Sequence, residues 1–144
     1  MTQHLFLAAC LGIATAATPA PQATVTVHVE NVRAAPGPLY LSLQKEAEFM
    51  QNRGSYGAVL AEPETGTATL VIADVAPGEY APVVWHDDNG NGAFDMGEDN
   101  RPLDGWSMVG ARQLTGEPRF EEVRIVVDEA RETVELEMVY GRGQ

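Results

Sequence analysis

The sequence predicts an all-β fold, a single antiparallel β-sandwich of about seven strands with one long loop. Three observations predict it. Short segments in which apolar and polar residues alternate recur along the chain between Gly- and Pro-rich turns. No segment of useful length has the 3.6-residue period of an amphipathic helix. Residues 87–118 are dense in Gly, Asn, Asp and Pro, so we expect them to form the long loop.

The alternating segments are expected to be strands that each turn one face toward the core. In chain order they are residues 23–32, 39–45, 58–62, 66–75, 79–86, 119–127 and 132–140. The side chains expected to point inward are Val25, Val27, Val29, Leu39, Leu41, Leu43, Ala68, Leu70, Ile72, Val134, Leu136, Met138 and Tyr140. This spacing of strands is typical of immunoglobulin-like and transthyretin-like sandwiches.

Some segments carry marks of their position in the sheets. Residues 58–62 are short enough for an edge strand, and Pro82 lacks an amide donor, which predicts an edge or a bulge there. Residues 46–57 lack alternation and allow one helical turn around Phe49. Residues 128–131 are expected to form the hairpin turn between the last two strands.

The first residues indicate export from the cytoplasm. Residues 1–17 contain a short apolar run that ends in small residues, as a secretory signal peptide does, although Lys and Arg are absent. Residues 18–23 read as a Pro/Ala linker, and 24–141 as the β-sandwich domain. We expect a periplasmic or secreted protein. The alternative is a lipid anchor on Cys10, the only cysteine of the chain.

The charge of the chain limits its partners. Twenty-one acidic and nine basic residues give a net charge of −12 at pH 7. Nucleic acid and anionic membrane surfaces are disfavoured, because both need clustered Lys and Arg. No segment is expected to span a membrane. Cations or basic partners are the natural counterparts of such a chain, and the sequence leaves the oligomeric state undefined.

The stretch "HDDNGNGAFDMGE" matches the twelve-residue calcium pattern D-x-[DN]-x-[DN]-G-x5-E. Carboxylate, amide and backbone oxygens in this spacing suit a hard cation such as Ca²⁺. Gly92 stands where the chain must bend sharply. The predicted metal ligands are Asp87, Asn89, Asn91, the backbone carbonyl of Ala93, Asp95 and Glu98.

The segments on either side of this loop are not those of an EF-hand, which has a helix on each side. A strand enters the loop, and Pro102 prevents a normal exiting helix. Glu98 could therefore be coincidental, with Asp99 or Asp104 as the last ligand. The alternative is a solvated Asn/Gly turn without an ion. If Ca²⁺ binds, we expect a Kd of about 10⁻⁴–10⁻³ M, as in extracellular modules.

Two further residues are candidates for ligand binding. His86 precedes the loop and would need a second nitrogen or sulfur ligand to hold a transition metal. Its alternative role is packing at a strand end with a hydrogen bond to the loop. Trp106 lies among turn residues beside the loop and could present an aromatic surface to a sugar. The commoner role of such a tryptophan is in the core.

The stretches "APGEYAPVVWHDDNGNGAFD" and "PLDGWSM" resemble the bacterial family known as domain of unknown function 2141. The matching residues are Pro77, Gly78, Tyr80, His86, Asp87, Asn89, Asn91, Gly92, Asp95, Pro102, Asp104, Gly105 and Trp106. The chain departs from the family pattern at Pro82 and in the spacing after Asp95. The resemblance implies a secreted β-sandwich with no assigned activity.

Three functions are compatible with these patterns. The first is a calcium-stabilised binding or structural module of the cell envelope. The second is a domain that binds carbohydrate or an envelope partner through residues 87–106 without a metal. The third is a metal-assisted hydrolase, supported only by Asp87 and His86, since no Ser-His-Asp set and no Gly-rich phosphate loop is present. We therefore expect no enzyme and name no catalytic residue.

Overall fold

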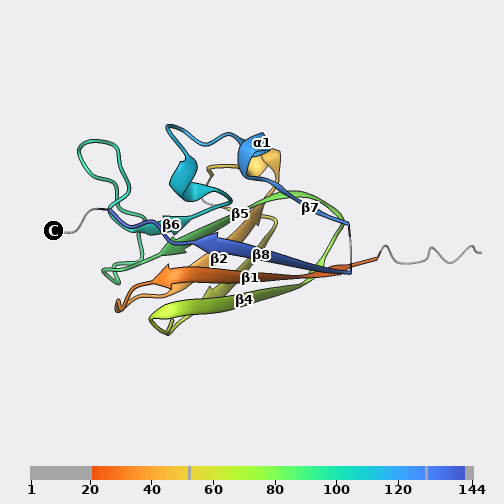
Figure 1. Ribbon diagram of the computed structural model, residues 1–144, viewed down its shortest axis with the longest axis horizontal. Coiled ribbons are helices and arrows are strands. Elements are labelled where there is room, and N and C mark those ends of the chain that lie inside the picture. The colour runs from red at the N-terminus through yellow and green to blue at the C-terminus, as the bar shows by residue number, and fades with distance from the viewer. Residues whose placement is uncertain (1–20, 52, 129, 142–144) are drawn as a thin grey trace, which may run out of the picture.

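The computed structural model describes residues 21–51, 53–128 and 130–141, whose strands form two sheets packed face to face (Figure 1). The strands are β1 Ala23–Val32, β2 Leu39–Gln44, β3 Tyr56–Leu60, β4 Gly66–Val75, β5 Gly78–His86, β6 Gly105–Ser107, β7 Ile125–Val127 and β8 Arg131–Glu137. The helical segments are the 3₁₀ turns η1 Glu46–Glu48 and η2 Ala111–Gln113 and the helix α1 Phe120–Val123. The predicted all-β sandwich is confirmed.

The first sheet has the strand order β4-β1-β8, and the second has the order β3-β2-β5-β6 with β7 also paired to β5. The pairing of β1 with β8 is parallel, whereas the other described pairings are antiparallel. Alternation along a strand predicts which face is buried but is the same for either direction of the neighbouring strand. The parallel pair is therefore a departure that the sequence pattern did not reveal.

Two sequence predictions near the C-terminus are wrong. β7 pairs with β5 and β8 pairs with β1, so residues 128–131 do not join the two strands of a hairpin. Residues 119–127 are not one strand either, because α1 occupies Phe120–Val123 before β7 begins. Phe120 and Val123 are both buried, and two apolar residues three positions apart share one face of a helical turn.

The main core lies between the two sheets. Every side chain predicted to point inward from residues 23–32, 39–45 and 66–75 is buried, and so are Val134, Leu136 and Met138. Tyr140 is only half-buried. A second apolar cluster joins Ala81 of β5 to α1 and the η2 region, which cover part of the outer face of the second sheet.

The strand boundaries explain Pro82 and change one domain limit. β5 pairs with β7 through residues 78–80 and with β6 through residues 84–86, so Pro82 lies where β5 has a neighbour only in β2. β3 is the predicted edge strand. β1 begins at Ala23, one residue inside the predicted linker. The predicted signal peptide and Cys10 lie outside the described residues.

Candidate metal loop

Residues 87–104 form the connection of the β5–β6 hairpin. His86 pairs with Gly105, so Asp87 and Asp104 stand on the two sides of the loop base. Figure 1 shows the loop projecting beyond the end of the sandwich opposite the start of β1. Met96 and Pro102 form a bridge inside it. The predicted stretch 87–118 is thus not one irregular loop, because β6 and η2 interrupt it.

The Asp87 carboxylate organises the first turn of the loop. Its side chain is almost fully buried, Oδ1 accepts the backbone N–H of Asn91 at 3.1 Å, and Oδ2 accepts that of Gly92 at 2.8 Å. The backbone N–H of Asp87 donates to the Pro38 carbonyl at 3.1 Å. A Cβ at Gly37 would stand 1.9 Å from the Asp87 carbonyl oxygen, so the chain approaches the loop base closely only because residue 37 is glycine.

Asn89, Asn91 and Asp95 form the exposed part of the same set. The side-chain amides of Asn89 and Asn91 donate to Asp95 Oδ2 at 2.6 and 2.7 Å. The Asn89 and Asn91 side-chain oxygens accept the backbone N–H groups of Asn91 and Ala93. The residues predicted at positions 1, 3, 5 and 9 of the calcium pattern therefore come together. Beside Asp95, the two amide N–H groups occupy the place that a cation would take.

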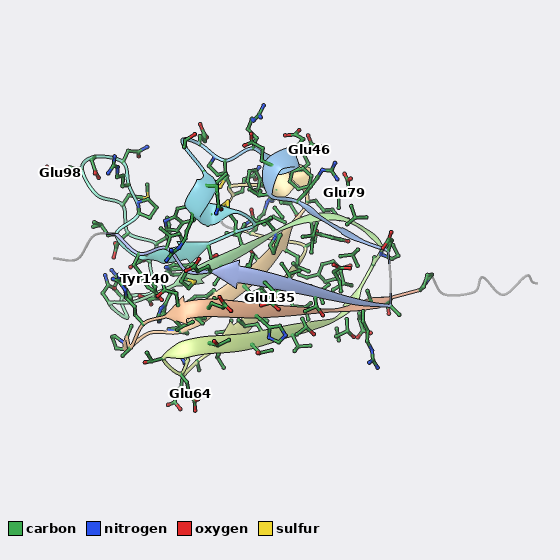
Figure 2. All side chains as sticks on the ribbon, in the orientation of Figure 1. Glu46, Glu64, Glu79, Glu98, Glu135 and Tyr140 are labelled. Carbon is green, nitrogen blue, oxygen red and sulfur yellow. The ribbon has the colours of Figure 1, made fainter. Side chains whose placement is uncertain are left out.

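Glu98 stands apart from this set. Its side chain is exposed at the outer tip of the loop (Figure 2) and forms no hydrogen bond or ion pair within the described part of the chain. Among residues 21–51, 53–128 and 130–141, no three His, Cys, Asp or Glu side chains gather closely enough to hold a metal ion. A cation at this loop would thus depend on the Asn and backbone oxygens as well as on carboxylates.

His86 is enclosed at the loop base. The backbone N–H of Arg33 donates to Tyr140 Oη at 3.1 Å, and the same hydroxyl is hydrogen-bonded to His86 Nδ1 at 2.8 Å. Burial lowers the pKa of His86. This effect is larger than the opposing effects of the Gly37 backbone and of the charges of Asp104 and Asp87, which raise the pKa. Burial therefore favours the neutral form of His86, whose ring packs at the end of β5.

Asp104 connects the loop to the sheet. Its Oδ2 accepts the indole N–H of Trp85 at 2.9 Å and the backbone N–H of Asp95 at 3.0 Å. Its Oδ1 is buried and has no partner among the described residues, which is also true of His86 Nε2. The pKa of Asp88 is raised, first by burial and then by the carboxyls of Asp104 and Asp87, with Arg33 acting against them.

Trp106 belongs to a row of residues that face one another across the second sheet. Val59, Tyr40, Trp85 and Trp106 are successive cross-strand partners. Trp106 is half-buried against the second apolar cluster, whereas the Tyr40 and Trp85 rings stack at 4.6 Å, with Phe94 edge-on to Trp85.

Sequence reasoning missed the central place of Asp104. It had appeared only as an alternative last ligand, and as part of the resemblance through "PLDGW". Its neighbours Trp85 and Asp88 come from the other side of the loop, 19 and 16 positions earlier in the chain. The one available signal was the position of the Asp104 carboxylate directly before Gly105, the first residue of β6.

Comparison with known proteins gives a family. The model of a family described as "Uncharacterized protein conserved in bacteria (DUF2141)" matches residues 27–135. No curated protein and no solved structure matches the chain. No helix in the described residues is long and apolar enough to cross a membrane.

Proposed function

This chain belongs to the DUF2141 family of bacterial proteins, and we propose that it is a calcium-stabilised binding or structural module of the cell envelope. Residues 87–98 hold the ion in this proposal. Export through residues 1–17, and the alternative lipid anchor on Cys10, are parts of the same proposal. It assigns no catalytic residue to the chain.

The contacts of Asp95 support calcium binding most directly. Two amide groups, from Asn89 and Asn91, converge on one carboxylate oxygen. Rotation of these two side chains would turn their oxygens toward the space that their N–H groups now fill. Amide and carboxylate oxygens are the ligands that Ca²⁺ takes.

The buried end of the loop gives a reason for stabilisation. Asp87 already orders residues 91 and 92 through its two hydrogen bonds. The ligand cage is therefore partly arranged before an ion arrives, which reduces the ordering that binding requires. The exposed Glu98 would have to swing inward from the loop tip to complete the shell.

Thermal unfolding in calcium and in chelator tests this function. With a Kd of about 10⁻⁴–10⁻³ M, 10 mM Ca²⁺ should stabilise the fold by about 1.4–2.7 kcal/mol. Mg²⁺ at the same concentration is the control for a general salt effect, because it demands a smaller, octahedral shell. Identical unfolding curves in calcium and chelator would contradict the proposal.

A second candidate, carbohydrate binding, is favoured by the aromatic row beside the loop. Tyr40 and Trp85 are half-buried, and Phe94 is 41% exposed, so part of this surface can face a sugar ring. A glycan array with wild type, Trp85→Ala and Trp106→Ala tests it. Loss of binding in Trp85→Ala alone would support this surface, and absence of binding to any glycan would exclude it.

A further inference from the structure

The Asp104 side chain has an oxygen that the described structure leaves without a partner. Asp104 is 1% exposed, and Oδ1 is completely enclosed, yet no hydrogen-bond donor reaches it within the described residues. A buried carboxylate oxygen is normally satisfied by a donor or a cation, because burial removes the water that would solvate its charge. Something beyond the hydrogen bonds of the folded chain is therefore expected at this oxygen.

The other oxygen fixes the direction of the group. Oδ2 is held by two donors, the Trp85 indole and the Asp95 backbone, one from β5 and one from the loop. Rotation of the carboxyl would break both hydrogen bonds. Oδ1 is thus kept in place by bonds that span the base of the loop, as a preorganised ligand would be.

The neighbourhood of this oxygen is acidic. The Asp88 carboxyl lies within hydrogen-bonding reach of the Asp104 carboxyl, and Asp87 is close enough to act on Asp88. The Arg33 guanidinium, whose charge acts on Asp88, lies over the Tyr140 ring at 4.4 Å from its centroid. Arg33 forms no ion pair in the described structure, so the two carboxylates lack a salt-bridge partner.

We propose that Asp88 and Asp104 form a second cation site at the loop base, which takes a hard divalent cation such as Ca²⁺. The site uses different side chains from the Asp87–Asn89–Asn91–Asp95 set and goes beyond the function proposed above. Two carboxylates supply the charge, and water completes the shell, as is common for oxygen-bound cations. The ion satisfies Oδ1 of Asp104 and removes the repulsion between the two acidic groups.

Counting bound Ca²⁺ per full chain by equilibrium dialysis tests the proposal. The variants are Asp104→Asn and Asp88→Asn for the second site, and Asp95→Asn for the loop. Glu64→Gln is the matched control, because it also removes one negative charge and lies in the β3–β4 turn rather than in the loop or its base. Far-UV circular dichroism checks that each variant folds. Asp88 is only partly buried, so Asp88→Asn tests the site even if Asp104→Asn does not fold.

The expected result is two ions per chain in wild type and Glu64→Gln, and one in each of the other three variants. The same number of bound ions in wild type, Asp88→Asn and Asp104→Asn would overturn the second site. A single ion in wild type that is lost only in Asp95→Asn would also overturn it. That last result would leave the loop proposal standing. An ion retained in Asp95→Asn but lost in Asp88→Asn would support the second site even where the loop binds nothing.

Tb³⁺ luminescence gives an independent reading of the same site. Trp85 donates a hydrogen bond to Asp104, so excited Trp85 should transfer energy to a Tb³⁺ ion held beside that carboxylate. In a Trp106→Phe background Trp85 is the only tryptophan. The comparison is made with Asp95→Asn added to this background, which disables the loop ligand set, because Asp95 and Trp85 both donate to the same Asp104 oxygen and a loop ion would also be sensitised. Emission that falls at least tenfold when Asp88→Asn is added supports the proposal, and emission that Asp88→Asn leaves unchanged there overturns it.

Discussion

Replacing Asp87 by alanine should weaken the fold even when no calcium is present. The substitution removes two hydrogen bonds from a buried carboxylate. It leaves the backbone N–H of Gly92 without its acceptor and that of Asn91 with only the Asn89 side-chain oxygen. Hydrogen bonds to charged groups contribute about 1.5–3 kcal/mol each, and the two here share one carboxylate. We therefore expect a loss of about 3 kcal/mol in the free energy of unfolding.

Asp95→Ala is the matched comparison. Asp95 also accepts two side-chain hydrogen bonds, but its partners Asn89 and Asn91 are exposed and can turn to water. Without calcium its loss should stay below about 1 kcal/mol. With calcium both variants should lose the ion's contribution, because each removes a predicted ligand.

Urea denaturation followed by circular dichroism, in chelator and in 10 mM Ca²⁺, measures both effects. At about 3–4 °C for each kcal/mol in a domain of this size, Asp87→Ala should also melt about 10 °C below wild type. Two results would refute the reasoning: Asp87→Ala within about 0.5 kcal/mol of wild type in chelator, or equal losses for Asp87→Ala and Asp95→Ala under that condition.

Three further predictions follow from packing and charge. Gly37→Ala should cost about 1–3 kcal/mol in urea denaturation, because its Cβ meets the Asp87 carbonyl oxygen at 1.9 Å; a wild-type curve would contradict this close approach. Leu43→Ala, at a fully buried position, should cost about 2–5 kcal/mol, whereas Val59→Ala, on the exposed face of β3, should change stability by less than about 0.5 kcal/mol. His86 should make the fold acid-sensitive. Burial lowers its pKa in the folded protein from the ordinary value of 6.5, so the unfolded chain binds the proton more readily. The stability that is present above pH 6.5 is therefore lost as the pH falls toward the lower pKa of the folded state. Urea midpoints measured against pH in wild type and His86→Gln check this, and equal pH dependence in the two proteins would exclude His86 as the cause.

The loop's internal contacts explain how it can be ordered without an ion. Asp95 receives two amide donors and Asp87 receives two backbone donors, so both carboxylates are solvated by the loop itself. Calcium would have to displace these hydrogen bonds, because both carboxylates already have donors before an ion binds. This competition favours the modest affinity expected of extracellular sites over the tight binding of cytosolic buffers.

The sequence by itself determined the β-sandwich, because strict alternation from Val25 to Val29 and from Leu39 to Leu43 leaves only one face of each strand able to enter a core. It also predicted which loop gathers Asp87, Asn89, Asn91 and Asp95, since their contacts span at most six positions. Local spacing is sufficient for contacts of that length.

Only the tertiary structure decided the rest. Alternation does not encode strand direction or partner, so the parallel β1–β8 pair and the separation of β7 from β8 depended on how the two sheets close over the core. Helical spacing of Phe120 and Val123 was too short a signal to outweigh the strand-like residues after it. The partners of Asp104 and His86 come from Trp85 and from Tyr140, brought together by the β5–β6 hairpin and by the last residues of the chain. Sequence distance hides such contacts because packing, not local geometry, creates them.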